Sequence, residues 1–187
     1  MSCLSCHSEH HAKSQEKMLA SFTVEETCLR CHTSVRKTLF QRSTHLFRTE
    51  QWVASDRRQV RHDQPTGLKM SCIACHNAHG GEGPKMLQAN SINATCYQCH
   101  ADKRGPFLWE HAPVKENCNT CHTPHGSNNE SLLKTRSHQL CQQCHMHMLW
   151  RHQTVAGFDI FTFNKGCVNC HTQTHGSNHP AGKALAR

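Results

Sequence analysis

The sequence is poor in the residues that build a hydrophobic core. Aromatic residues make up 6% of the 187 positions, and the mean hydropathy is −0.69. No apolar run approaches the roughly 18 residues that a membrane-spanning helix needs. A chain this polar cannot bury much apolar side-chain surface of its own. The composition therefore excludes a transmembrane helix, and something other than side chains is expected to form the core.

Cysteine is what the chain has in quantity, and every cysteine follows one pattern. Cys-x-x-Cys-His occurs seven times and uses all fourteen cysteines. It is the attachment signature of c-type haem, in which two thiols bond the vinyl groups and the histidine binds the iron as the proximal ligand. We predict seven covalent haems c on Cys3, Cys6, Cys28, Cys31, Cys72, Cys75, Cys96, Cys99, Cys118, Cys121, Cys141, Cys144, Cys167 and Cys170, with the proximal histidines His7, His32, His76, His100, His122, His145 and His171.

Zinc sites and disulfides are the alternatives to haem. Cys-x-x-Cys pairs build four-cysteine zinc sites two at a time, and seven pairs is an odd number. Neither alternative explains a histidine after every pair. With 19 histidines in 187 residues, seven such followers would arise by chance about once in 10 million sequences, so the haem interpretation is preferred.

The formal charge of +8 would ordinarily suggest a nucleic-acid partner. Each haem adds two propionates, and a ferric iron in its porphyrin carries about +1. Seven haems bring the total to roughly +1 when oxidised and −6 when reduced. The basic residues therefore balance propionates, and no nucleic-acid partner is predicted.

The motifs are of two types that alternate along the chain. First-type motifs, which begin at Cys3, Cys72, Cys118 and Cys167, have another histidine close behind them. Second-type motifs, which begin at Cys28, Cys96 and Cys141, have one further on. The two-haem unit recurs about every 46 residues, which indicates a stacked array. We predict one extended heptahaem domain over 1–187, with a long insertion at about 46–68.

Regular structure is expected to be sparse. We predict mostly coil with short α-helices wrapped around a stacked chain of haems, with little or no β structure. Helices are expected at 12–20, 27–41, 94–102, 105–111 and 138–150. The polar tail 176–187 is expected on the surface.

Recurrent histidines are the candidates for the second, distal iron ligand, since no methionine recurs at a fixed place. Seven histidines occupy repeat-consistent positions: His10, His45, His79, His111, His125, His152 and His175. Bis-histidine ligation predicts low-spin, low-potential haems that transfer electrons. The other non-motif histidines, His11, His62, His138, His147 and His179, are expected to be solvated.

Pairing of these ligands with particular haems is a separate hypothesis. A histidine three residues after a motif is too close to cross the ring of its own haem, so it is expected to serve a neighbour. We expect His45, His111 and His152 on the Cys72, Cys118 and Cys167 haems, and His79, His125 and His175 on the Cys28, Cys96 and Cys141 haems. The Cys3 haem is left to take His11, a histidine far along the chain or one from a neighbouring molecule, and is expected to be an entry or exit point for electrons.

Several segments closely resemble the MtrA/DmsE/PioA-type decahaem cytochromes. They are the stretch from Cys96 to Pro106, Trp109-Glu110-His111, Leu140 to His145, and His175-Gly176-Ser177 with the residues that follow. The resemblance implies a string of bis-histidine haems that is threaded through an outer-membrane β-barrel porin and passes electrons between periplasmic and extracellular partners, including other multihaem cytochromes. This chain matches the last seven of ten haems, and its stretch 45–62 is longer and more basic.

The leading hypothesis is therefore an electron-transfer protein and not an enzyme. It is expected in the periplasm or at the outer membrane, with an extracellular position left open. Since haem attachment of this type occurs outside the cytoplasm and no signal peptide is visible, we expect a processed form or a piece of a longer protein. One alternative is a subunit of an extracellular cytochrome filament that associates end to end. The other is a multihaem reductase, but no Cys-x-x-Cys-Lys motif is present to leave an iron open.

Overall fold

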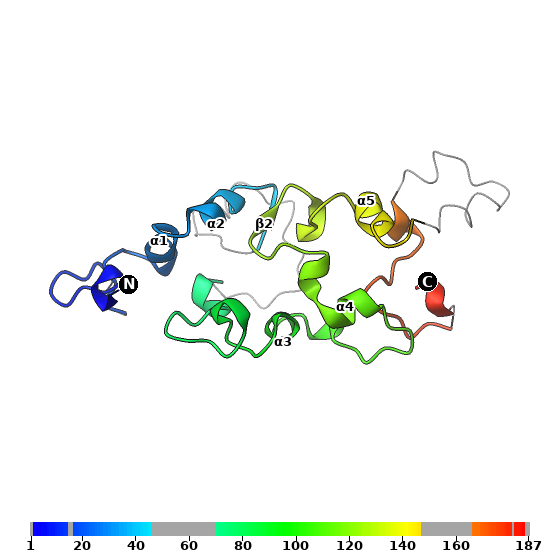
Figure 1. Ribbon diagram of the computed structural model, residues 1–187, viewed down its shortest axis with the longest axis horizontal. Helices are drawn as coiled ribbons and strands as arrows, with labels where there is room; N and C mark the ends of the chain where they lie inside the picture. The colour runs from blue at the N-terminus through cyan, green and yellow to red at the C-terminus, as the bar shows by residue number, and fades with distance from the viewer. Residues whose placement is uncertain (1, 15–16, 46–69, 147–165, 181, 186–187) are drawn as a thin grey trace.

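The computed structural model describes residues 2–14, 17–45, 70–146, 166–180 and 182–185. The described chain is elongated, and its two termini lie toward opposite ends (Figure 1). It is mostly coil with short helices and one small sheet, which confirms the predicted fold class of a multihaem c-type cytochrome. No helix within these ranges is long and apolar enough to cross a membrane.

The described elements are short. The α-helices are α1 (Val24–Leu29), α2 (Thr33–Thr38), α3 (Ile92–Tyr97), α4 (Ala112–Glu116) and α5 (Ser137–Gln142). Turns of 3-10 helix are η1 (Cys3–Ser5), η3 (Cys72–Ala74), η4 (Pro84–Met86), η5 (Ala101–Lys103), η6 (Cys118–Thr120), η7 (Glu130–Leu132), η8 (Cys167–Asn169) and η9 (Gly182–Ala184). Strands β1 (Ser43–Thr44) and β2 (Gly126–Ser127) pair antiparallel.

The helices begin where the sequence offers a capping side chain. Thr23 Oγ1 accepts the backbone N–H of Glu26 at the start of α1, and Ser91 Oγ accepts that of Ala94 at the start of α3. Pro113 occupies the first turn of α4, where its missing N–H costs nothing. Helices of five or six residues are not stable alone, so contacts elsewhere must hold them.

The two motif types differ in local structure. Each first-type motif forms a 3-10 turn (η1, η3, η6 and η8), whereas each second-type motif begins inside an α-helix (α1, α3 and α5). Each of these helices packs on the 3-10 turn of the next first-type motif: α1 on η3, α3 on η6 and α5 on η8. The alternation seen in the sequence is therefore a structural repeat.

Several expected helices are wrong in detail. Residues 12–14 and 17–20 form no helix, because Ser14 and Leu19 bridge across a loop. The helix expected at 27–41 is interrupted between α1 and α2. Segment 105–111 is extended, and α4 begins after it. Helix α5 ends at Gln142, and 147–150 lie outside the described residues.

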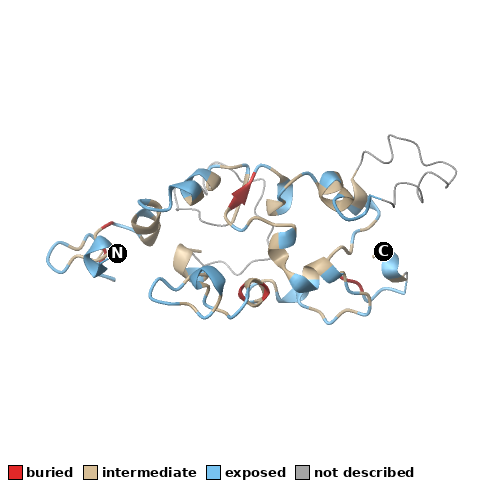
Figure 2. Cartoon of the chain, in the orientation of Figure 1, coloured by how far each residue is buried: buried red, intermediate tan, exposed pale blue. Residues whose placement is uncertain are grey.

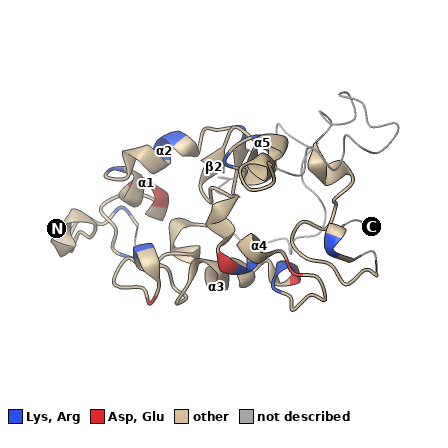
Figure 3. Cartoon of the chain, turned by 45° about the vertical axis from the view of Figure 1, so that its right-hand side comes forward, with Lys and Arg blue, Asp and Glu red and all other residues tan. Residues whose placement is uncertain are grey.

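The described polypeptide has almost no apolar core. Leu19 is its one buried hydrophobic side chain, whereas Phe22, Phe40 and Leu108 are two-thirds to three-quarters exposed (Figure 2). Charged residues are scattered along the length of the molecule (Figure 3). Apolar surface left open in this way is what a bound apolar group would cover.

We expect the polypeptide without haem to be unfolded. With one buried hydrophobic residue among those described, little apolar burial offsets an ordering cost of about 1–2 kcal/mol per residue. Circular dichroism of protein made without haem attachment is expected to show coil and no cooperative melt. The matured protein is the control, and a cooperative transition in the haem-free chain would contradict the expectation.

Candidate haem-binding sites

All seven motifs close into the same backbone turn. In each, the histidine N–H donates to the carbonyl of the first cysteine at 2.9–3.1 Å. The turn sets the histidine beside both thiols, as attachment to one haem requires. All fourteen cysteines are free thiols, and no cluster of three or more metal-ligating side chains forms in the described ranges.

Five motif histidines face a distant histidine across a gap. The pairs are His7 with His79, His45 with His100, His76 with His125, His111 with His145, and His122 with His175. Their ring centres are 5.9–6.2 Å apart and their planes lie within 13–29° of parallel. An imidazole nitrogen lies about 2 Å from a metal ion and about 1 Å from its own ring centre, so rings on either side of one ion have centres about 6 Å apart. Each gap fits one iron.

Backbone carbonyls fix the tautomer of these imidazoles. Nδ1 lies 2.5–3.0 Å from a carbonyl oxygen in His7, His45, His76, His111, His122 and His171. Since a carbonyl only accepts, Nδ1 carries the proton and Nε2 keeps its lone pair. Metal-binding histidines usually donate their second N–H in this way. The rings are therefore ready to bind iron through Nε2.

The carbonyls that serve first-type motifs come from a loop that the sequence analysis missed. The acceptors are Lys17, Lys85, Ser131 and Ala184. In each case the next residue has a positive φ although it is not glycine: Met18, Met86, Leu132 and Leu185, with φ of 50–59°. Such strain persists only where surrounding contacts demand it. The recurring Lys-Met-Leu at 17–19 and 85–87 was the available signal.

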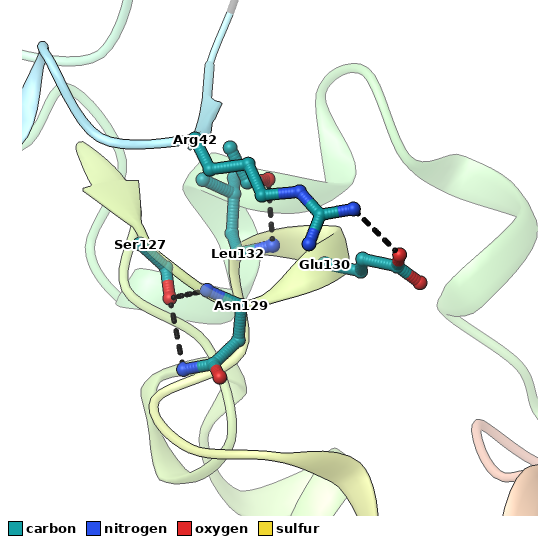
Figure 4. A network of polar contacts seen from close by, with 6 residues as sticks. Arg42, Ser127, Asn129, Glu130 and Leu132 are labelled. Atoms are coloured by element: carbon teal, nitrogen blue, oxygen red, sulfur yellow. Dashed lines mark hydrogen bonds and ion pairs between the residues drawn. The ribbon is translucent and has the colours of Figure 1, made fainter.

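Two antiparallel bridges bring the distant histidines into place. In the first, which we call the β1–β2 clamp, Thr44 pairs with Gly126, and the next residues outward are His45 and His125. Nδ1 of His45 donates to Pro124 O at 3.0 Å. Around it, Leu132 N–H donates to Ser43 Oγ, Ser127 Oγ accepts from Asn129, and Arg42 pairs with Glu130 (Figure 4). That ion pair is exposed and adds little stability.

The second bridge, the Trp109 clamp, repeats this geometry. Trp109 and Ser177 exchange both backbone hydrogen bonds at 2.9 and 3.0 Å. His111 and His175 lie two residues beyond this pair, as His45 and His125 lie two residues beyond the pair Ser43–Ser127. Nδ1 of His111 donates to Thr174 O, which corresponds to Pro124. The expected surface tail at 176–187 is thus partly wrong, because Ser177 is buried.

Comparison with known proteins agrees with this architecture. The doubled CXXCH motif family matches residues 1–37, 65–105 and 111–149. This chain belongs to that family. It is also 45% identical over 196 aligned residues to "Multiheme cytochrome MtrA" of Shewanella baltica (strain OS185), covering 100% of this chain and 53% of that protein.

The chain is therefore an MtrA-type multihaem c-type cytochrome with covalently bound haem. It spans about half the length of the curated relative that it matches. The resemblance seen in the sequence is confirmed at the level of the family.

The distant histidines of this MtrA-type chain are suited to bind metal at neutral pH. Burial lowers the pKa of His45, His125 and His175 below the ordinary value. Neighbouring charged groups, His100 for His45 and His76 for His125, lower the pKa further. Neutral imidazole is the form that binds iron.

The expected pairing of histidines with haems is wrong at five positions. His45 faces His100 and not His76, and His111 faces His145 and not His122. The histidines that follow first-type motifs face the preceding first-type motif: His79 faces His7, His125 faces His76 and His175 faces His122. The cause is the clamps, which join segments far apart in sequence, whereas the expectation considered only neighbouring motifs.

Other candidate ligands are placed less completely. His152 lies outside the described residues, as do His62 and His147. The His10 side chain is exposed and lies near Glu9. Within the described ranges, His10 and His32 face no second imidazole. The Cys3 haem was left to take His11, a histidine far along the chain or one from a neighbouring molecule, and its His7 faces His79, a histidine far along the chain.

The motifs follow one another in a continuous line. A hydrogen bond from Cys72 lowers the pKa of the Cys28 thiol to about 7. Burial and then Cys118 raise the pKa of Cys96 to about 12, and burial and then Cys167 raise that of Cys141 to about 11. Burial and then the Cys99 thiol raise the pKa of Cys75, and burial and then the Cys144 thiol raise the pKa of Cys121. Motifs adjacent in sequence are therefore adjacent in space from Cys28 to Cys167.

A basic hollow adjoins two of the distant histidines. A cavity of about 270 Å³ is lined by His111 and His175 together with Lys103, Arg104 and Lys115. Lys115 also pairs with Glu110 at 2.8 Å. These cations suit the carboxylates of a haem.

We expect Gly126→Ala to disturb two haems together. A Cβ at Gly126 would lie 2.0 Å from Thr38 O, a backbone atom that cannot move aside. The β1–β2 clamp would open and release both His45 and His125. Electron paramagnetic resonance is expected to show two altered low-spin signals with no haem lost. Exposed Asn128→Ala is the control, and an effect on one haem or none would contradict the account.

Proposed function

We propose that this chain holds seven bis-histidine haems c and passes electrons along them in motif order. The observation that supports this most directly is the set of five opposed imidazole pairs, each of one motif and one non-motif histidine. The haem iron supplies the redox chemistry by cycling between ferric and ferrous states. The polypeptide supplies attachment, ligation and order.

Each residue class has a role in this proposal. The fourteen cysteines attach the porphyrins and the seven motif histidines are proximal ligands. His45, His79, His111, His125 and His175 are distal ligands of irons in this chain, whereas His10 and His152 are distal ligands whose irons, in this chain or in a docked one, the structure does not identify. Carbonyls such as Lys85 O orient the rings, and basic residues such as Lys103 neutralise propionates. With both axial positions taken, an iron has no site for a substrate, so the role is transfer and not catalysis.

The resemblance to MtrA-type proteins extends the proposal to location and partners. We propose a periplasmic, outer-membrane-associated protein that exchanges electrons with other multihaem cytochromes, in association with a β-barrel porin. The relative's name, which describes a multihaem cytochrome, and the 45% identity support this role.

The haem count has a direct test. The intact mass of denatured, matured protein is expected to exceed the 21.2 kDa polypeptide by seven haem masses, because seven motifs share one turn geometry. A fully matured sample with six haems or fewer would refute the count.

The ligand assignment is tested by His111→Met and His175→Met. Each is expected to raise the potential of one haem, since methionine ligation favours ferrous iron, and to leave the other six unchanged. Haem methyl resonances, assigned by NMR through their thioether neighbours, are expected to place His111 on the Cys141 haem and His175 on the Cys118 haem.

His138→Met is the matched control, because His138 lies on α5 and faces no imidazole ring among the described residues. An unchanged redox titration for His111→Met would remove that histidine from the ligand set. Shifts on the Cys118 haem for His111→Met would restore the pairing expected from the sequence.

A further inference from the structure

The two clamps follow one rule. Each joins a segment that follows a second-type motif to a His-Gly segment that follows a first-type motif. The two histidines of a clamp face consecutive motifs. In the β1–β2 clamp, His125 faces His76 and His45 faces His100. In the Trp109 clamp, His175 faces His122 and His111 faces His145. One clamp thus serves both haems of one two-haem unit, and neighbouring units exchange histidines.

A third His-Gly segment, His79-Gly80, has half of this arrangement. His79 faces His7, as the rule requires. Gly80 has φ +130°, and the corresponding Gly176 has φ +131°. A Cβ on Gly176 would meet Phe107 at 2.2 Å, and one on Gly126 would meet Thr38 O at 2.0 Å. Among the described residues, a Cβ on Gly80 would meet nothing within 4 Å. No described segment therefore covers at Gly80 the face that a partner segment covers in both clamps.

The motif that this open clamp would serve is the one at Cys28. In both complete clamps, the histidine opposite the His-Gly segment faces the second-type motif of the same unit. For the unit of Cys3 and Cys28 that histidine would face His32. The chain also has a histidine that it could donate to such a partner. His10 follows the first-type motif at Cys3, and its side chain is 85% exposed.

We propose that the edge at Gly80 is a docking surface for another two-haem unit of the doubled CXXCH type. A strand of that unit pairs antiparallel beside His79-Gly80, and its histidine becomes the sixth ligand of the iron held by Cys28, Cys31 and His32. His10 in return ligates an iron of the docking unit. This rests on the proposed function, since it requires haem at the Cys28 motif.

The 187-residue holo-protein without its partner then has one iron open. A peptide of residues 105–115, which carries His111 and its natural clamp sequence, is the probe. Adding it to ferric protein is expected to convert one haem in seven from high to low spin. The matched peptide with His111→Ala is the control and is expected to convert none. Carbon monoxide is expected to bind one reduced haem, and the peptide to prevent this.

Other outcomes would overturn the docking surface. If all seven haems are low-spin without the peptide, the Cys28 iron already has its ligand and the inference fails while the proposed function stands. If free imidazole at the same concentration converts the haem as well as the peptide does, no strand docks at Gly80. If mass spectrometry finds no haem at Cys28, the proposed function is what fails.

Donation of His10 to the docking unit is tested by separate variants. His10→Ala is expected to leave the spectrum of all seven haems unchanged, because His10 serves an iron outside this chain. His79→Ala is expected to alter one haem, that at Cys3. A changed haem in His10→Ala would show that His10 acts within the chain and would refute the exchange between units.

Discussion

The structure depends on pairs of imidazoles that approach one metal position from distant parts of the chain. Almost no apolar side chain is buried among the described residues, so the polypeptide has no core of its own to organise it. In the proposed function, ligation replaces that core, because each iron would join two segments that are otherwise held by few contacts. The free energy of haem binding is then the free energy of folding, as in small metal-dependent domains. The short helices follow from this, since they need only present cysteines at a fixed angle.

The clamps explain how a polar chain achieves the precision that ligation needs. Two backbone hydrogen bonds join Trp109 and Ser177, and two residue pairs join β1 and β2. In each clamp, the carbonyl of the residue before the His-Gly histidine accepts from the ring of the opposite histidine. The same register occurs in segments whose sequences differ, Ser43-Thr44-His45 and Trp109-Glu110-His111. Geometry is therefore repeated through backbone contacts and not through side-chain identity, which lets the surrounding surface vary.

Sequence reasoning reached the cofactor and the motifs because their chemistry is local, within five residues. The histidines at 45, 79, 111, 125 and 175, which each occupy a fixed place in the repeat, are also the ones that face motif histidines in the structure, and their role as distal ligands stays a prediction. Their pairing was not predictable in the same way. It is set by bridges between residues such as His45 and Pro124, which are 79 positions apart, and nothing in either segment specifies the other. The Lys85 and Ser131 carbonyls were missed because backbone atoms leave no residue signature.

Exchange of ligands between units has a consequence for electron transfer. A haem whose two ligands came from one unit could shift with that unit and change its distance to the next haem. Here His45 and His125 come from the units before and after the haems that they face. The unit of Cys72 and Cys96 is thereby tied to both neighbours, and the contacts of α1 with η3 and α3 with η6 act between the same neighbours. Under the proposed ligation, the bonds that set the ligands would also hold the spacing along the line, so the haem order and the stability of the array would have one physical origin.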